Sequence, residues 1–147
     1  MANTLDSMIG HRTPRYSAFG WAAARADDIL NTVPAPLSGV LLVTAAVFAK
    51  NGRPGHALAI MLRDGRKHHS PNAGWPESAM AGALGLALAG PRRYPEGLVA
   101  DPWLGDGSAR AGVSDILRGL QLYRLACFLE AGLLVGAWLA MHATLLA

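Results

Sequence analysis

The residues of this 147-residue chain that are best suited to chemistry lie in one short stretch, between positions 63 and 77. Five of them are cations or histidines that precede a turn: Arg63, Arg66, Lys67, His68 and His69. The sequence that follows, Ser70-Pro71-Asn72-Ala73-Gly74, is rich in turn-forming residues. Pro76 then suits the first turn of a helix, and Glu77 suits the positive end of that helix.

Cations placed ahead of a helix start are suited to bind a phosphate or a carboxylate, because free backbone N–H groups and the helix dipole attract anions there. The stretch therefore predicts an anion site. A basic flank at a membrane surface gives the same pattern and, judged on the pattern alone, is the commoner case. A metal site at His68 and His69 is disfavoured, because adjacent histidines on an extended segment point apart and no other ligand is spaced to complete the site.

Several other classes of site are excluded by spacing or composition. Gly105-Asp106-Gly107 follows no expected strand, so it is not a dinucleotide-binding turn, and no GxxxxGK[ST] loop occurs. A single cysteine, Cys127, rules out a disulfide framework within the chain. The net charge is +3, but no interleaved aromatic and basic residues indicate nucleic-acid binding.

Two long apolar segments flank this polar region and must position it. Hydrophobic residues make up 52% of the chain and charged residues 16%, against about 25% in soluble domains. The first apolar segment covers 34–50 and the second 126–147, where Glu130 and His142 lie near the ends. Their lengths predict two membrane spans in a single membrane domain.

The intervening region, 51–125, is expected to be cytoplasmic, because ten of the thirteen Lys and Arg residues lie between positions 50 and 125. It should open with a helix over His56–Arg63 and contain a short or re-entrant helix over 76–90 that Gly90-Pro91 ends. Gly82 and Gly85 in that helix indicate close approach to another helix. Residues 1–33 are expected to form a loop and a short helix. The fold class expected is all-α: a multi-pass helical membrane protein with a long polar loop region between two spans.

Several stretches in this order resemble the adenosylcobinamide-phosphate synthase family of the late cobalamin pathway. They are NTLDSMIG (3–10), RY..FGW (15–21), RDGRKHHSPNAGWPESAMAGALG (63–85), PWLG (102–105) and DILRGLQLYR (115–124). SPNAGWPE is the most specific of them. Members of the family are longer chains, and the match corresponds to their C-terminal half, so the resemblance implies either a truncated or mis-started product or a separate N-terminal half.

The resemblance implies a multi-pass enzyme of the inner membrane that consumes ATP. It would join the propionate carboxylate of adenosylcobyric acid to the amine of aminopropanol, or its phosphate, giving adenosylcobinamide or its phosphate. The cofactors implied are ATP and magnesium (Mg²⁺), with no tightly bound prosthetic group. The partners implied are the corrinoid and the amine, membrane lipid, and a separate N-terminal half or other cobalamin-pathway enzymes, with no nucleic acid.

The resemblance also suggests roles for individual residues. The cations that would neutralise phosphate oxygens are Arg63, Arg66 and Lys67. The residues that would hold magnesium are Asp64 and Glu77. The residues that would manage protons during catalysis are His68, His69 and Glu77. Those that would bind and orient the polar groups of the substrate are Asn72, Trp75, Asn3 and Asp6.

Two other classes of function compete with an enzyme. A non-catalytic membrane scaffold for soluble cobalamin enzymes would need the apolar segments but no constrained polar cluster. A transporter subunit would need polar residues at mid-span, and Leu37–Ala49 has none stronger than Thr44. The transporter is therefore disfavoured, and the scaffold stays as the alternative.

Overall fold

The computed structural model describes residues 25–70, 72–94 and 97–146, and most of them are helical. A short helix, Arg25–Asn31, is followed by α3 (Pro34–Phe48), α4 (Pro54–Asp64) and α5 (Gly74–Leu84). Four short strands come next: β1 (Leu88–Ala89), β2 (Arg92–Tyr94), β3 (Gly97–Val99) and β4 (Trp103–Leu104). The 34-residue helix α6 (Val113–Leu146) completes the described chain.

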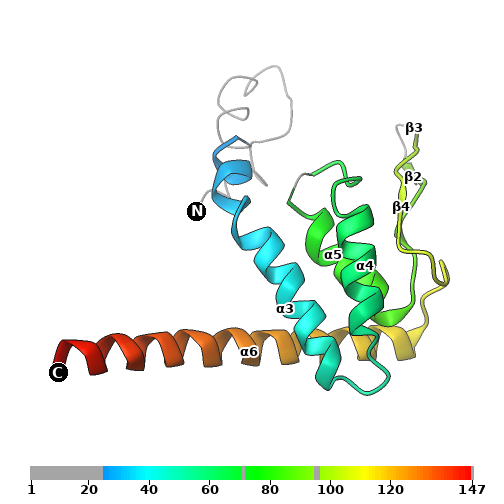
Figure 1. Cartoon of the computed structure of the whole chain (residues 1–147). Coiled ribbons are helices and arrows are strands. Elements are labelled where there is room, and N and C mark those ends of the chain that lie inside the picture. The colour runs from blue at the N-terminus through cyan, green and yellow to red at the C-terminus, as the bar shows by residue number, and fades with distance from the viewer. Residues whose placement is uncertain (1–24, 71, 95–96, 147) are drawn as a thin grey trace.

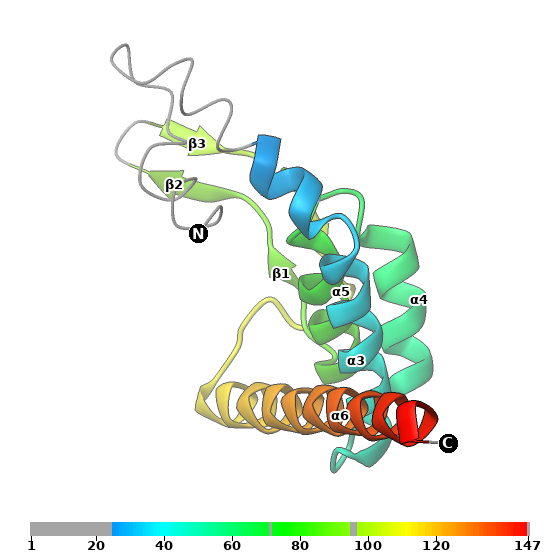
Figure 2. The same cartoon turned by 90° about the vertical axis from the view of Figure 1, so that its left-hand side faces the viewer.

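Helices α3, α4 and α5 lie side by side, and α6 crosses beside them near one end of this layer (Figure 1). Seen from the side, α6 lies against one end of α3 and α5, and the strands project from the other side of the molecule (Figure 2). Proline starts two of these helices: Pro34 in α3 and Pro54 in α4. A proline fits a first turn because that position needs no backbone N–H.

The expectation of an all-α fold was wrong in detail, since strands lie within the predicted polar region. β1 pairs antiparallel with β4, and β2 pairs antiparallel with β3. The region 51–125 contains two helices, α4 and α5, as expected, and these two small sheets, which were not expected. The helix predicted over His56–Arg63 is confirmed as part of α4.

The helix predicted over 76–90 begins earlier and ends earlier than expected, at Gly74 and Leu84. Gly85 ends it with a left-handed backbone (φ 71°), and the Leu86 N–H donates to the Ala81 carbonyl at 2.9 Å. This is the glycine C-cap common at helix ends. Sequence periodicity missed it because the apolar residues continue without interruption into β1.

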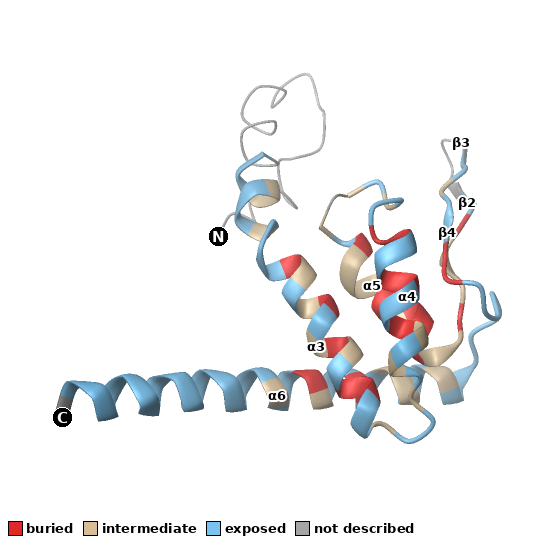
Figure 3. Cartoon of the chain, viewed as in Figure 1, coloured by how far each residue is buried: buried red, intermediate tan, exposed pale blue. Residues whose placement is uncertain are grey.

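The buried residues lie where the helices face one another (Figure 3). Most of the residues in this core are alanines, which lets the helices approach closely. A Cβ added at Gly82 of α5 would lie 2.7 Å from the Ala57 Cα of α4 and 2.9 Å from the His56 carbonyl oxygen. The close approach predicted for Gly82 is thus confirmed, whereas Gly85 serves as the helix cap. Leu122 and Ala126 of α6 complete the core, together with residues of α3, α4 and α5.

Within the described residues, α6 is the helix that is long and apolar enough on its own to cross a membrane. Its apolar half carries large exposed side chains, among them Leu133, Leu134, Trp138 and Leu145, and Figure 3 shows this half exposed throughout. The predicted span 34–50 corresponds to α3, which meets the same test only together with Arg25–Asn31, across a bend of 43°. The multi-pass arrangement stays a prediction.

Candidate active site

Asp64, at the end of α4, is fully buried and lies at the centre of a charged cluster. Arg63 donates from Nε to its Oδ1 at 2.8 Å and from Nη2 to its Oδ2 at 2.6 Å. Lys67 places Nζ 2.7 Å from Oδ1, and the Gly105 backbone N–H donates to Oδ2 at 2.9 Å. The carboxylate therefore ties the end of α4 to the segment that follows β4.

The environment of Asp64 keeps it ionised. The Arg63 guanidinium, against the opposing effect of burial, holds the pKa of Asp64 well below its usual range, and Lys67 and the Gly105 amide act in the same direction. The same contact raises the pKa of Arg63. Because both carboxylate oxygens of Asp64 contact cations, this side chain stabilises the local structure at the end of α4.

Asp106 extends this cluster to the start of α4. It accepts a hydrogen bond from Arg63 Nη1 at 3.1 Å, and its other oxygen lies 3.1 Å from His56 Nε2. His56 Nδ1 lies 2.9 Å from the Gly82 carbonyl oxygen of α5. The sequence analysis missed both His56 and Asp106. Asp106 had been considered only as part of a glycine turn, and nothing in the spacing connects it to residue 63.

His68 and Glu77 lie together, as two members of one predicted site should. Their Nε2 and Oε2 atoms are 3.3 Å apart, although nine residues separate them along the chain. His68 Nδ1 lies 2.9 Å from the Ser70 backbone nitrogen and 3.2 Å from the Ser70 carbonyl oxygen, while Nε2 faces Glu77. His69 is exposed and forms no hydrogen bond, ion pair or ring contact within the described part of the chain.

Close packing of the loop brings the two helix ends together. A Cβ at Gly74, the first residue of α5, would lie 2.0 Å from the Gly65 carbonyl oxygen and 2.8 Å from the His68 Cβ. Any larger residue at position 74 would push α5 away from the end of α4. This glycine therefore sets the distance between the His68 loop and Glu77.

A second group of residues in the candidate site consists of Arg66, Asn72 and Trp75. The Arg66 guanidinium lies 5.8 Å from the centre of the Trp75 ring, within the range of a cation–π contact. Asn72 donates to the Asp28 carbonyl oxygen at 3.1 Å. Trp75 and Asn72 also line a pocket of about 410 Å³, whose remaining lining residues are Arg25, Asp28, Ile29, Thr32 and Pro36.

The three predicted phosphate-binding cations differ in their surroundings. Arg63 and Lys67 both pair with Asp64, whereas Arg66 pairs with no carboxylate in the described part of the chain. Asn3 and Asp6, the other predicted substrate contacts, lie outside the described residues.

The predicted magnesium ligands do not form a protein-built metal centre. Asp64 already accepts from two cations and an amide, and Glu77 pairs with His68. Across the described residues, no group of three His, Cys, Asp or Glu side chains is arranged to hold a metal ion. These side chains thus do not fit Mg²⁺ held by the protein alone.

A comparison with known protein families shows to which family the chain belongs. A family model described as CobD/Cbib protein matches residues 1–123. The chain belongs to the CobD/CbiB family. The charged cluster, the His68–Glu77 pair and the pocket beside Trp75 all lie within the matched residues.

Curated CobD proteins resemble the chain over most of its length. The cobalamin biosynthesis protein CobD of Rhodobacter capsulatus is 52% identical over 124 residues, which is 84% of this chain and 38% of the relative. Those of Sinorhizobium sp and Yersinia enterocolitica are 48% and 46% identical and cover 90% and 86% of this chain.

The chain spans about two fifths of these CobD relatives, between 38% and 42% of their length, and matches their C-terminal part. Their names support a role in cobalamin biosynthesis. No solved structure matches the chain.

Proposed function

We propose that this chain is the C-terminal part of an amide ligase of cobalamin biosynthesis. The reaction proposed is ATP-dependent amide formation between the propionate carboxylate of adenosylcobyric acid and aminopropanol or its phosphate. Membership of the CobD/CbiB family supports the pathway. The reaction belongs to a whole protein, of which this chain spans about two fifths.

The observation that carries the catalytic part of the proposal is the contact between His68 and Glu77. An amine that attacks a carboxyl carbon must lose a proton, and a carboxylate nearby can accept it. His68 Nε2 lies 3.3 Å from Glu77 Oε2, and a proton on Nε2 would orient the carboxylate. Glu77 would take the amine proton, and His68 would hold Glu77 in place and help to move that proton onward.

Arg66 is the cation we expect to contact phosphate oxygens. It stacks on Trp75 and has no carboxylate partner among the described residues, so its charge is available to an anion. When bound, ATP supplies the phosphoryl group that activates the carboxylate. Asp64 offsets the charges of Arg63 and Lys67, and we expect these two cations to shape the site more than to bind phosphate.

We further propose that the protein lies in the inner membrane with several spans and that residues 50–125 face the cytoplasm. The exposed apolar half of α6 supports membrane association, and the ten cations between positions 50 and 125 support the orientation. The amine, the corrinoid and ATP would then meet the site from the cytoplasm. The N-terminal part that the relatives contain would complete it.

The alternative is a non-catalytic membrane scaffold for other cobalamin enzymes. Internal pairing of Arg63 and Lys67 favours it, because those cations are explained without a substrate. An inactive truncated product is compatible with the same contacts. A complementation experiment separates the three.

The experiment uses a bacterial strain from which the native CobD gene has been deleted. The chain is expressed alone, and also together with the N-terminal part of the Rhodobacter capsulatus relative. Rescue of corrinoid synthesis by either arrangement supports a working enzyme part. Failure of both contradicts the catalytic assignment for this chain.

Arg66→Gln and Glu77→Gln then test the site in whichever arrangement rescues. Loss of a general base typically costs 10²–10⁴-fold in rate, so we expect Glu77→Gln to abolish rescue. Arg110→Gln and Glu130→Gln remove the same charges elsewhere and should rescue normally. If Arg66→Gln and Glu77→Gln also rescue normally, a scaffold is the better description.

A further inference from the structure

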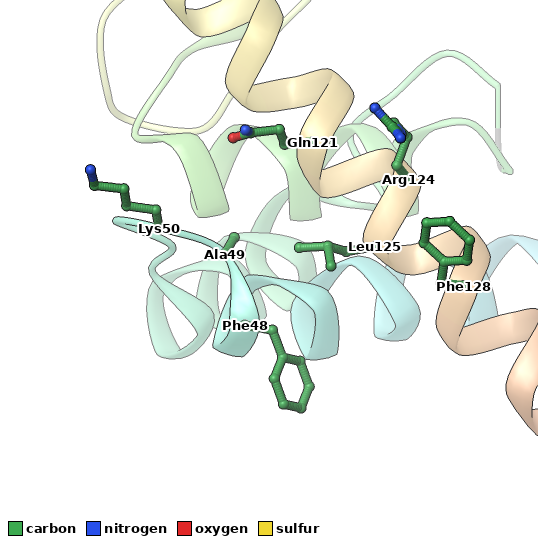
Figure 4. Close-up of a pocket in the computed structure, with 7 residues that line it drawn as sticks. All are labelled: Phe48, Ala49, Lys50, Gln121, Arg124, Leu125 and Phe128. Carbon is green, nitrogen blue, oxygen red and sulfur yellow. The ribbon is translucent and has the colours of Figure 1, made fainter.

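A second pocket lies far from the proposed catalytic residues, where the end of α3 meets the middle of α6. Its volume is about 320 Å³. Figure 4 labels its lining residues: Phe48, Ala49, Lys50, Gln121, Arg124, Leu125 and Phe128. In this view Lys50 and Arg124 stand at opposite ends of the pocket, with Gln121 between them. Leu125 is one of the apolar residues of its lining.

The two cations of this pocket are not neutralised within the protein as described. Neither Lys50 nor Arg124 forms an ion pair with any described residue. The nearest acid that follows on α6 is Glu130. Nine residues, two and a half helical turns, separate it from Gln121, so it lies on the opposite face of α6. The pocket thus carries two positive charges and a side-chain amide, and no described carboxylate lines it.

The pocket also marks the place where α6 changes from polar to apolar. After Arg124 the described helix contains one further residue of the Asp, Glu, Lys and Arg group, Glu130. The 22 residues from 125 to 146 rise about 33 Å, close to the ~30 Å thickness of a bilayer's hydrocarbon core. Arg124 therefore falls at the level of the lipid headgroups when this half of α6 lies in a membrane. Lys50 directly follows the apolar helix α3 and its neighbour Ala49.

We propose that this pocket binds the phosphate headgroup of an anionic phospholipid. Lys50 and Arg124 would attract the anionic headgroup from opposite ends of the pocket, and Gln121 between them would donate a hydrogen bond to a phosphate oxygen. The acyl chains would follow Phe128 and the exposed apolar residues of α6. Basic pockets between membrane helices bind anionic lipids by this combination of charge and apolar surface. The site does not rest on the proposed amide ligase activity.

The test uses the full chain, purified in neutral detergent and mixed with phosphatidylglycerol or with phosphatidylcholine of the same acyl chains. Native mass spectrometry measures how much of each lipid the protein retains. We expect the chain to retain phosphatidylglycerol preferentially. Each basic residue near an anionic headgroup strengthens binding about fivefold, so Lys50→Gln with Arg124→Gln should weaken retention about 25-fold.

A double variant at Arg53 and Arg110, both to Gln, removes the same charge outside the pocket and should retain phosphatidylglycerol like the parent chain. Circular dichroism establishes whether the variants are folded. If the Lys50→Gln, Arg124→Gln double variant does not fold, the two single variants replace it, and each should retain phosphatidylglycerol about fivefold more weakly than the parent chain. Equal retention by all variants, an equal loss in the control, or no preference over phosphatidylcholine would overturn the proposal. Displacement of the lipid by millimolar inorganic phosphate would instead make this a site for soluble phosphate and would also overturn it.

Discussion

The Asp64 carboxylate is charged although it is buried, because two cations and one amide N–H surround its two oxygens. The sequence analysis treated Asp64 as a magnesium ligand and Arg63 and Lys67 as phosphate ligands, each by itself. It had no means of detecting that opposite charges one and three residues apart would pair with each other before any ligand arrived. It also could not detect the contact with Gly105, which lies 41 residues away.

Asp64→Asn should lower the stability of the chain by about 1–3 kcal/mol, because the substitution removes a charged acceptor from a buried position. For a chain of this size, we expect the melting temperature to fall by roughly 2–10 °C. Thermal unfolding in detergent, followed by circular dichroism at neutral pH, measures the change. An unchanged melting temperature would show that the cluster does not hold α4 to the segment after β4.

The stability of the parent chain and that of the Asp64→Asn variant should depend differently on pH. Because the folded state lowers the pKa of Asp64 below its ordinary value of about 4, the carboxylate stabilises the protein at every pH above that value. Its contribution is lost only as the pH falls below about 4, toward the lowered pKa. Melting curves of the parent and Asp64→Asn should therefore differ equally at pH 7 and pH 5 and converge in stronger acid. Convergence already at pH 5 would contradict the assignment.

His68 and Glu77 were both selected from sequence, and the structure brings them to 3.3 Å. The turn residues between them predicted that the chain reverses there, which explains why the two side chains meet. Their roles in a site stay a prediction. His56 and Asp106 were not selected, since their contact depends on how β4 and its following loop pack on α4. Local sequence pattern can therefore indicate a contact across one turn, whereas the contact between His56 and Asp106 depends on residues that are far apart in the sequence.

At the scale of elements, helix α5 is shaped by two glycines with different tasks. Gly82 lets α4 approach, while Gly85 supplies the left-handed end of the helix. From the sequence alone, Gly82 and Gly85 looked alike. Each is a small residue that disfavours a helix, so its presence in one needed an explanation. Only the backbone conformation distinguishes a packing glycine from a capping one, and apolar periodicity does not report that conformation.

Gly82→Ala should destabilise the pair of helices, because the added methyl group would lie 2.7 Å from the Ala57 Cα and must push α4 and α5 apart. Overpacking of this kind typically costs 1–3 kcal/mol. Gly136→Ala is the matched control: Gly136 also lies within a helix, but nothing stands within 4 Å of its added methyl group. Since alanine favours a helix over glycine by up to about 1 kcal/mol, the control should melt at the same or a higher temperature. Equal behaviour of the two variants would contradict close packing at Gly82.

At the scale of the whole molecule, α6 divides into two parts that have different surroundings. Its first part contributes Leu122 and Ala126 to the core, and its later part is exposed apolar surface. The apolar run at 126–147 was predicted from sequence as a segment separate from the polar residues before it. Their union in a single 34-residue helix was not predicted, because charge content changes at Arg124 while helix propensity does not.

A chain that ends after Glu130 should keep its core but lose its hold on the membrane. This truncation leaves Leu122, Ala126 and Leu129 in place and removes the exposed apolar half of α6. Washing membranes with alkaline carbonate measures the difference, and we expect the truncated chain to be released in much larger amount than the full chain. Retention of the truncated chain would assign membrane attachment to α3 with Arg25–Asn31, the bent pair that also passes the length test.

The exposed apolar half of α6 has a practical consequence for handling the protein. In buffer without detergent, the leucines, tryptophan and methionine of this half are exposed to water, so separate copies of the chain should form soluble aggregates or precipitate. In detergent a micelle should coat this surface instead, and the particle that elutes from a sizing column will be much heavier than the 15.4 kDa polypeptide. Subunit counting must therefore subtract the bound detergent before any stoichiometry is assigned.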